Sequence, residues 1–188
     1  DSSKRQSAWT RFRGEGQVLD TVAHLAVANS TLAIRDPNNP GPQGAFRSQP
    51  LSDSPLFDIS PHDSTLVIVD RRATSADRFS VVKVTPRGDT LHASRIPYSP
   101  QPLPEGLVSR LIEEQVEGAL RSPAVGHLGR ATLEELVREA LHVPPAEPPV
   151  SAVVVASDAG VWLRREALER DTVEWLVLDA ALQPVGRT

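Results

Sequence analysis

The stretch DISPHDSTLVIV at residues 58–69 decides the fold, because the chain contains a second version of it. FSVVKV at 79–84 follows the first version. The second version reads VVVASDAGVWL at 153–163 and is followed by WLVLD at 175–179. A unit that returns in the same order along one chain predicts a repeat architecture, in which each copy builds the same local structure.

The two versions align at an offset of about 95 residues, which pairs Asp63 with Asp158 and Phe79 with Trp175. A helical segment of roughly 40 residues separates them, so the underlying period is about 50 residues. Each version is rich in β-branched residues and is punctuated by proline, glycine and aspartate, which favours short strands joined by tight turns. We therefore expect two four-stranded antiparallel units. The expected strands are 56–59, 65–70, 78–85 and 90–96 in the first unit, and 151–156, 160–165, 173–178 and 183–187 in the second.

In residues 105–142 the spacing of the apolar residues no longer fits short strands. Apolar residues recur at helical spacing and predict an amphipathic helix over 105–121. Thr132 and Glu135 form a capping-box pattern that predicts the start of a second helix, and Pro144 ends it.

The predicted fold is therefore mainly β, with about three antiparallel four-stranded units and a two-helix insertion. We expect a single domain over residues 1–188. Its predicted parts are a partial unit at 7–50, a full unit at 51–97, the helical insertion at 98–149 and a full unit at 150–188.

Composition narrows the function classes. The 188 residues carry a net charge of -4, and no lysine or arginine cluster offers the basic surface that nucleic-acid binding needs. No apolar run approaches the roughly 18 residues of a membrane span. Cysteine and methionine are both absent, which favours an oxidising, extracytoplasmic compartment such as the periplasm. Because the chain does not start with methionine, we expect it to begin after processing or to be part of a longer protein.

The order of motifs resembles the C-terminal portion of bacterial six-bladed β-propeller proteins, which are mostly secreted or envelope proteins related to the NHL and TolB-like groups. The resemblance covers roughly residues 50–188. It implies a partial β-propeller, in which each four-stranded unit is a blade. The motifs that carry the resemblance are 60–63, 88–91, 97–102, 144–149, 158–162 and 175–179.

No catalytic, cofactor or metal site is predicted. The sequence has no nucleophile elbow, phosphate-binding loop, dinucleotide fingerprint or calcium loop. Its tryptophans, Trp9, Trp162 and Trp175, are more typical of blade-core packing than of ligand stacking. None of the five histidines lies at metal-ligand spacing from another: His24, His62, His92, His127 and His142.

The sequence therefore favours a non-catalytic binding or scaffolding module of the bacterial cell envelope, with other protein subunits as partners. Tyr98, Leu107 and Leu111 are the candidate partner-binding residues. One alternative is an extrinsic accessory subunit that stabilises a membrane-embedded photosynthetic or respiratory complex, which involves peripheral membrane association. Another is a propeller-type lyase or hydrolase.

Overall fold

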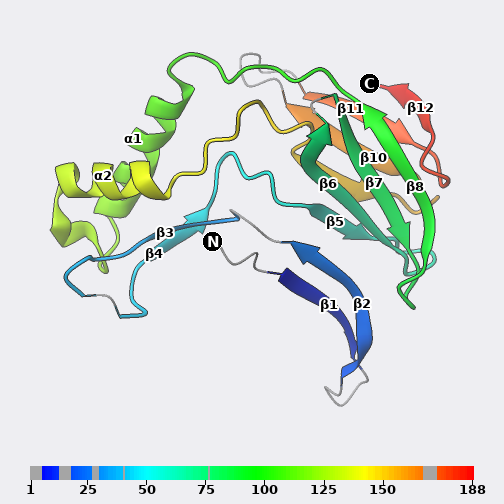
Figure 1. Cartoon of the computed structure of the whole chain (residues 1–188), viewed down its shortest axis with the longest axis horizontal. Coiled ribbons are helices and arrows are strands. Elements are labelled where there is room, and N and C mark those ends of the chain that lie inside the picture. The colour runs from blue at the N-terminus through cyan, green and yellow to red at the C-terminus, as the bar shows by residue number, and fades with distance from the viewer. Residues whose placement is uncertain (1–5, 13–17, 27–29, 40, 76, 167–172) are drawn as a thin grey trace. The chain divides into compact units, whose positions relative to one another are not determined.

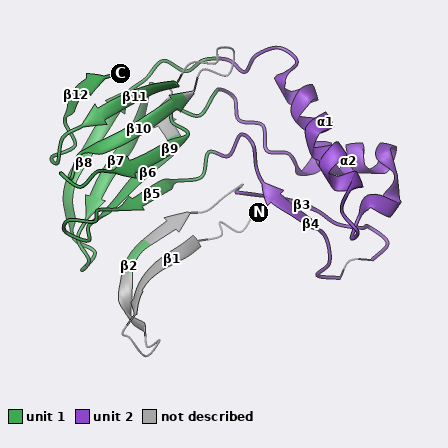
Figure 2. Cartoon of the chain, turned by 180° about the vertical axis from the view of Figure 1, so that it is seen from behind, with its two compact units in different colours: residues 1–28, 53–101, 147–188 green, residues 29–52, 102–146 purple. Residues whose placement is uncertain are grey.

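The computed structural model describes residues 6–12, 18–26, 30–39, 41–75, 77–166 and 173–188. These residues are mainly β, with two four-stranded and two two-stranded antiparallel sheets and two α-helices (Figure 1). This confirms the predicted mainly-β class and the pair of helices. The chain divides into two compact units (Figure 2). Unit 1 comprises residues 1–28, 53–101 and 147–188, and unit 2 comprises 29–52 and 102–146.

Each of the two predicted full units forms one four-stranded sheet within unit 1. In both sheets every strand pairs with its neighbour in sequence, as a meander. Sheet one contains β5 (Leu56–Ile59), β6 (Leu66–Ser75), β7 (Arg78–Val84) and β8 (Thr90–Pro97). Sheet two contains β9 (Ala152–Val155), β10 (Val161–Glu166), β11 (Val173–Leu178) and β12 (Pro184–Arg187).

The first turn of each sheet uses the same aspartate. Asp63 Oδ1 accepts a hydrogen bond from the backbone N–H of Thr65 at 3.1 Å, and Asp158 Oδ1 accepts one from Gly160 at 3.0 Å. The residue between each pair is left-handed, with φ of 55° in the first turn and 64° in the second. An aspartate that bonds the backbone two residues on stabilises such a turn. The predicted alignment of Asp63 with Asp158 is therefore confirmed.

The last turn of each sheet is also shared. Thr85 Oγ1 accepts from the backbone N–H groups two and four residues on, at 3.2 and 3.1 Å. Asp179 Oδ1 accepts from the same two relative positions at 2.9 and 2.8 Å. The fourth residue of each turn is left-handed, namely Gly88 with φ of 92° and Leu182 with φ of 63°. A threonine in one sheet and an aspartate in the other thus supply the accepting oxygen at the same position of the turn.

Counting back from these turns corrects one predicted pairing. Because Thr85 and Asp179 occupy the same position, Trp175 corresponds to Val81, and Phe79 corresponds to Val173. A register irregularity lies at matching places within β7 and β11, between residues 83 and 84 and between 177 and 178. The alignment of Phe79 with Trp175 is therefore wrong by two residues.

The two sheets pack against each other through opposite faces. Side chains alternate between the two faces of a strand, so the strand registers assign each residue to a face. We define face A of sheet one by Asp58, Val67, Val69, Phe79, Val81 and Lys83, and face A of sheet two by Val154, Trp162, Arg164, Val173, Trp175 and Val177. We define face B of sheet one by Phe57, Ile59, Leu66, Ile68, Val82 and Val84, and face B of sheet two by Val153, Val155, Val161, Leu163, Leu176 and Leu178.

Face A of sheet one and face B of sheet two share one buried core. Val67 and Val81 on the first, and Leu163 on the second, are fully buried. At the edge of this core β5 contacts β9, and Asp58 Oδ2 accepts a hydrogen bond from the backbone N–H of Val155 at 2.8 Å. Burial of branched aliphatic side chains from both sheets stabilises the pair.

Arg71 fixes the ends of the segments that connect unit 1 to unit 2. Its buried guanidinium donates from Nε to the Ser54 carbonyl at 2.7 Å and from an Nη to the Val150 carbonyl at 3.0 Å. Burial lowers the pKa of Arg71 to about 10, against the raising effect of nearby Asp53. The side chain stays charged at neutral pH, and both of these bonds are charge-assisted.

The predicted partial unit at 7–50 is not one sheet in the part of the chain that the structure describes. β1 (Gln6–Phe12) and β2 (Val18–Ala26) form a two-stranded antiparallel sheet in unit 1. β3 (Thr31–Ile34) and β4 (Ala45–Ser48) form another in unit 2. The exact blade count and the domain boundaries stay predictions.

Unit 2 builds its core from the β3–β4 sheet and the helices. These are α1 (Leu107–Leu120), the 3-10 turn η1 (Gly126–Leu128) and α2 (Arg130–Ala140). Ile112 and Val116 of α1, Leu133 and Val137 of α2, and Leu32 of β3 belong to one buried cluster. The single apolar face of each helix is therefore covered, as expected for amphipathic helices.

The predicted start of α2 at the Thr132 capping box is wrong. The helix begins at Arg130, after Gly129, whose φ is 77°, and no side chain caps its N-terminus. At the other end, the buried amide of Gln49 donates to the Ala140 carbonyl at 2.7 Å and accepts from the His142 N–H at 3.1 Å. Gln49 thus satisfies backbone groups that the helix leaves without an intrahelical partner.

Candidate interaction surface

Tyr98, a predicted partner-binding residue, directly follows β8 and packs on the core of unit 1. Its ring meets that of Phe79 edge to face, with centroids 6.1 Å apart. Burial raises the pKa of the Tyr98 hydroxyl. The ring is half-buried, and a role for it in partner binding stays a prediction.

The other two candidates, Leu107 and Leu111, lie on α1 in unit 2. Leu107 is buried, whereas Leu111 is half-buried and packs against the helical core. The opposite side of α1 is charged, with Glu113 and Glu117 both bound to Arg130 of α2. Tyr98 therefore belongs to unit 1 and the two leucines to unit 2, and their binding roles stay predictions.

Face A of sheet two is an outward-facing apolar surface. Val154 is 46% exposed, and Trp162 and Trp175 are half-buried. The two indole rings meet edge to face, with centroids 6.2 Å apart and an interplanar angle of 70°. Val177 pairs in register with Trp162 and continues the apolar surface onto β11. Large aromatic surfaces that remain partly accessible are typical of binding sites.

Face A of sheet one is the equivalent of this face, and it is covered by sheet two. Trp162 and Trp175 correspond to Val67 and Val81, which are both 0% exposed under sheet two. A neighbouring sheet therefore covers these two positions in sheet one, whereas sheet two carries larger side chains at the equivalent positions. Trp162 and Trp175, predicted to be core residues, are half-buried instead, and the Trp9 side chain lies outside the described residues.

Face B of sheet one is apolar and only partly exposed, since Leu66 and Val84 on it are buried. Ile59 is 47% exposed, and Ile68 and Val82 are half-buried. The corresponding residues of sheet two, Val155 and Leu163 among them, are buried in the shared core. Each sheet therefore has two apolar faces, which is why its strands lack a regular alternation of apolar and polar residues.

The carboxylate of Asp63 in unit 1 has a structural role. Burial alone raises the pKa of Asp63, but the hydrogen bonds from Thr65 and the nearby Lys83 ammonium hold it well below its usual range. Lys83 Nζ lies 3.2 Å from Asp63 Oδ2 and is almost fully buried. Asp158 closes the equivalent turn of sheet two, where Val177 replaces the lysine. A turn-forming role accounts for both aspartates without catalysis.

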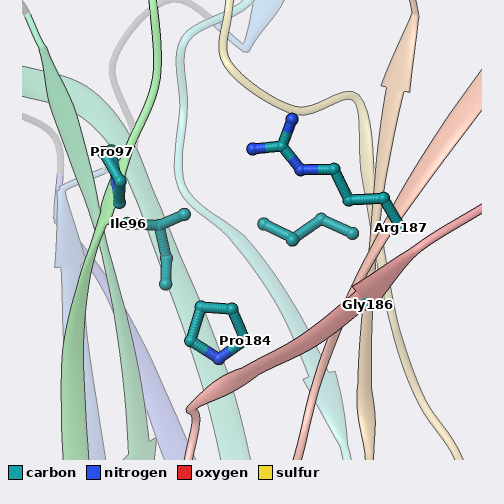
Figure 3. A pocket seen from close by; sticks show the side chains of 6 residues that line it. Ile96, Pro97, Pro184, Gly186 and Arg187 are labelled. Carbon is teal, nitrogen blue, oxygen red and sulfur yellow. The ribbon is translucent and has the colours of Figure 1, made fainter.

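A cavity of about 310 Å³ opens between the ends of β8, β11 and β12. Figure 3 shows Ile96 and Pro184 facing the same space, with the Arg187 side chain extending beside it. The Arg187 guanidinium lies 3.6 Å from Glu174 and so already has a carboxylate partner. The cavity is lined mostly by apolar groups and offers few polar contacts that would orient a ligand.

Within the described residues, no group of three or more histidine, cysteine, aspartate or glutamate side chains is placed to hold a metal ion. His127 Nε2 instead lies 3.2 Å from Asp36 Oδ2 in unit 2, while His24 lies outside the residues whose side chains are described. Neither described helix is long and apolar enough to cross a bilayer.

The sequence contained a signal for the outward face of sheet two that the prediction did not use. The runs VVV at 153–155 and VWL at 161–163 place apolar residues on both faces of their strands. Such runs are typical of strands covered on two sides. Comparison with known proteins gives no further guide, since no family model, curated protein or solved structure matches the chain.

Proposed function

We propose that the chain is a non-catalytic module of the β-propeller type that binds other proteins through the exposed face of its second sheet. The observation that carries the proposal is face A of sheet two. It presents Val154, Trp162 and Trp175 at positions whose counterparts in sheet one are covered by a neighbouring sheet. Stacked four-stranded meanders with repeated turns are the building plan of propeller blades.

We place this module in the bacterial cell envelope. The absence of cysteine and methionine suits an oxidising compartment, because neither thiols nor thioethers are present to be oxidised. Repeat proteins of this kind commonly act as scaffolds, since stacked units offer extended surfaces to their partners.

A paired substitution tests the binding function. Val154→Lys places a charge on face A of sheet two, and Val143→Lys is its control, because Val143 is 45% exposed and lies in unit 2. The tagged chain is incubated with a bacterial envelope extract, and any protein retained in stoichiometric amount is purified and titrated against the variants. We expect Val154→Lys to weaken binding about tenfold or more and Val143→Lys to leave it unchanged. Equal binding by both variants would refute the proposed surface.

A further inference from the structure

The outer edge of sheet one is open along β8. Among the described residues, β7 is the only strand that pairs with β8. The backbone groups of an edge strand point alternately toward the neighbouring strand and away from it. Because the Tyr98 N–H donates to the Asp77 carbonyl at 2.8 Å, this alternation turns the backbone N–H and C=O groups of Ala93 and Arg95 outward. β8 therefore offers a template on which another strand can pair.

β12, the corresponding edge of sheet two, is less suited to accept a strand. It has four residues, begins with Pro184, which has no N–H, and contains a register irregularity. Short length, proline and irregular register all protect an edge from pairing. β8 has eight residues, and its irregularity and its proline lie at its two ends, which leaves residues 92–96 regular.

The cavity beside β8 lies where a side chain of an added strand would point. Ile96 is in register with Phe79 of face A, so its side chain faces sheet two and forms one wall of the cavity (Figure 3). Leu176 and Pro184 line the cavity from sheet two. Ile96 and Leu176 are 2% and 6% exposed, so the floor of the cavity is apolar and buried. Neighbouring residues on adjacent strands point to the same face, so a residue paired beside Ile96 would place its side chain in this cavity.

Arg95 adds a requirement for charge. It is exposed, its in-register neighbour on β7 is Ser80, and no carboxylate in the described part of the chain pairs with it. Arg187 at the cavity, by contrast, already has Glu174 at 3.6 Å. A carboxylate beside Arg95 on an added strand would meet a cation without a partner, whereas a lysine there would be repelled.

We propose that β8 binds an extended peptide segment of a partner protein, which adds a strand to sheet one. The bound segment places an apolar side chain in the cavity beside Ile96 and an acidic side chain beside Arg95. Its backbone supplies the polar contacts that the cavity lacks, which favours a peptide over a small molecule as the ligand. The site is separate from face A of sheet two, because Ile96 and Leu176 belong to the core between the sheets.

A designed peptide tests this site by fluorescence anisotropy. The probe is the capped, fluorescein-labelled peptide TVTELETVT, whose side-chain pattern is the same in both directions along β8. When its leucine lies beside Ile96, a glutamate lies beside Arg95. We expect the wild-type chain to bind this peptide, and to bind TVTEKETVT about tenfold or more weakly, because the lysine would bury its charge among apolar groups. Binding of neither peptide up to about 1 mM, or equal binding of both, would overturn the inference.

A charge exchange at Arg95 tests the predicted register. We expect Arg95→Glu to bind TVTELETVT about tenfold or more weakly and to bind TVTKLKTVT in its place, because the charges are complementary again. Arg87→Glu is the matched control, since Arg87 is exposed, lies in the last turn of the same sheet and undergoes the same change of charge. Binding of TVTKLKTVT also shows that the Arg95→Glu chain is folded. Equal effects of the two variants would show that net charge governs binding, and would contradict the proposed site.

Val154→Lys separates this site from the surface assigned under the proposed function. We expect this variant to bind TVTELETVT as the wild-type chain does, because Val154 lies on face A of sheet two and does not line the cavity. Loss of peptide binding in Val154→Lys would contradict a separate site. If the wild-type chain bound no peptide while Val154→Lys still weakened binding of an envelope protein, the inference would be wrong and the proposed function would stand.

Discussion

Sheet one and sheet two form equivalent backbone turns with partly different side chains. Their first turns share an aspartate, yet their last turns use Thr85 in one and Asp179 in the other to accept the same two N–H groups. Gly88 and Leu182 likewise take the same left-handed position. The repeat therefore requires a side-chain oxygen acceptor at the first position of the last turn and a left-handed backbone at its fourth. More than one residue type meets each requirement.

The faces of the two sheets differ more than their turns. Lys83 on face A of sheet one pairs with Asp63, whereas its counterpart in sheet two is Val177. Val67 is covered, while its counterpart Trp162 is half-buried. Turns are local and therefore change little, whereas a face depends on what lies against it. Three experiments test this contrast.

The largest effect comes from a core position present in both sheets. Leu163 in sheet two is fully buried, and its counterpart Ile68 in sheet one is half-buried. We expect Leu163→Ala to lower the free energy of unfolding by about 3 kcal/mol and Ile68→Ala by roughly 1 kcal/mol, because only the first leaves a closed cavity. Urea denaturation at low protein concentration measures both. Equal losses would show that face B of sheet one is covered as completely as face B of sheet two.

An intermediate effect distinguishes the two last turns. Asp179 offers a charged acceptor at 2.9 and 2.8 Å, whereas Thr85 offers a hydroxyl at 3.2 and 3.1 Å. Charge-assisted hydrogen bonds are the stronger kind, so we expect Asp179→Ala to lose about 1.5 kcal/mol of stability and Thr85→Ala about 0.7 kcal/mol. Thermal unfolding measures the difference. Asp179→Asn and Thr85→Ser keep an acceptor and serve as controls; if each destabilised as much as its alanine variant, the turn hydrogen bonds would not be the cause.

The smallest effect depends on pH. Although burial raises the pKa of Asp63, its bonds to Thr65 and Lys83 lower that pKa below the unfolded value of 3.8. A carboxyl whose pKa is lowered by folding adds stability above the unfolded pKa and loses it as the pH falls toward the folded pKa. We expect Asp63→Asn to lose roughly 1 kcal/mol at pH 7, because the carboxylate is partly exposed, and progressively less below pH 4.

Unfolding titrations of wild type and Asp63→Asn between pH 7 and pH 2 measure this effect. Asp158→Asn is the matched control, since Asp158 bonds one backbone N–H and its sheet has valine where sheet one has Lys83. We expect a smaller loss at pH 7 for the control. A difference between wild type and Asp63→Asn that stayed constant down to pH 2 would rule out the ionised Asp63 as its source.

Much of the fold followed from local patterns. All eight strands of the two sheets were predicted, because β-branched runs and turn residues define each strand without reference to the rest of the chain. The start of α2 was missed, since Gly129 precedes the helix where a capping side chain was expected. The core that Leu32 of β3 shares with the helices was not predicted, because nothing local in the sequence indicates it.

The candidate surface was harder to predict than the fold. Tyr98 is a predicted partner-binding residue, yet its ring packs against Phe79. Val154 and Trp162 belong to the repeated stretch, but their exposure depends on which face of sheet two is covered. That choice is made by sheet one, whose partner residues lie about 95 residues earlier in the chain.

The sequence by itself determined the repeated strands, their turns and the two amphipathic helices, because hydrogen bonding within a turn and hydrophobic periodicity are local properties. Only the tertiary structure decided that face A of sheet one is buried while face A of sheet two is outward. The physical reason is that both faces are apolar, so the sequence favours covering each of them. Which face becomes covered depends on the packing of whole sheets, and that packing is set by contacts between residues far apart in sequence.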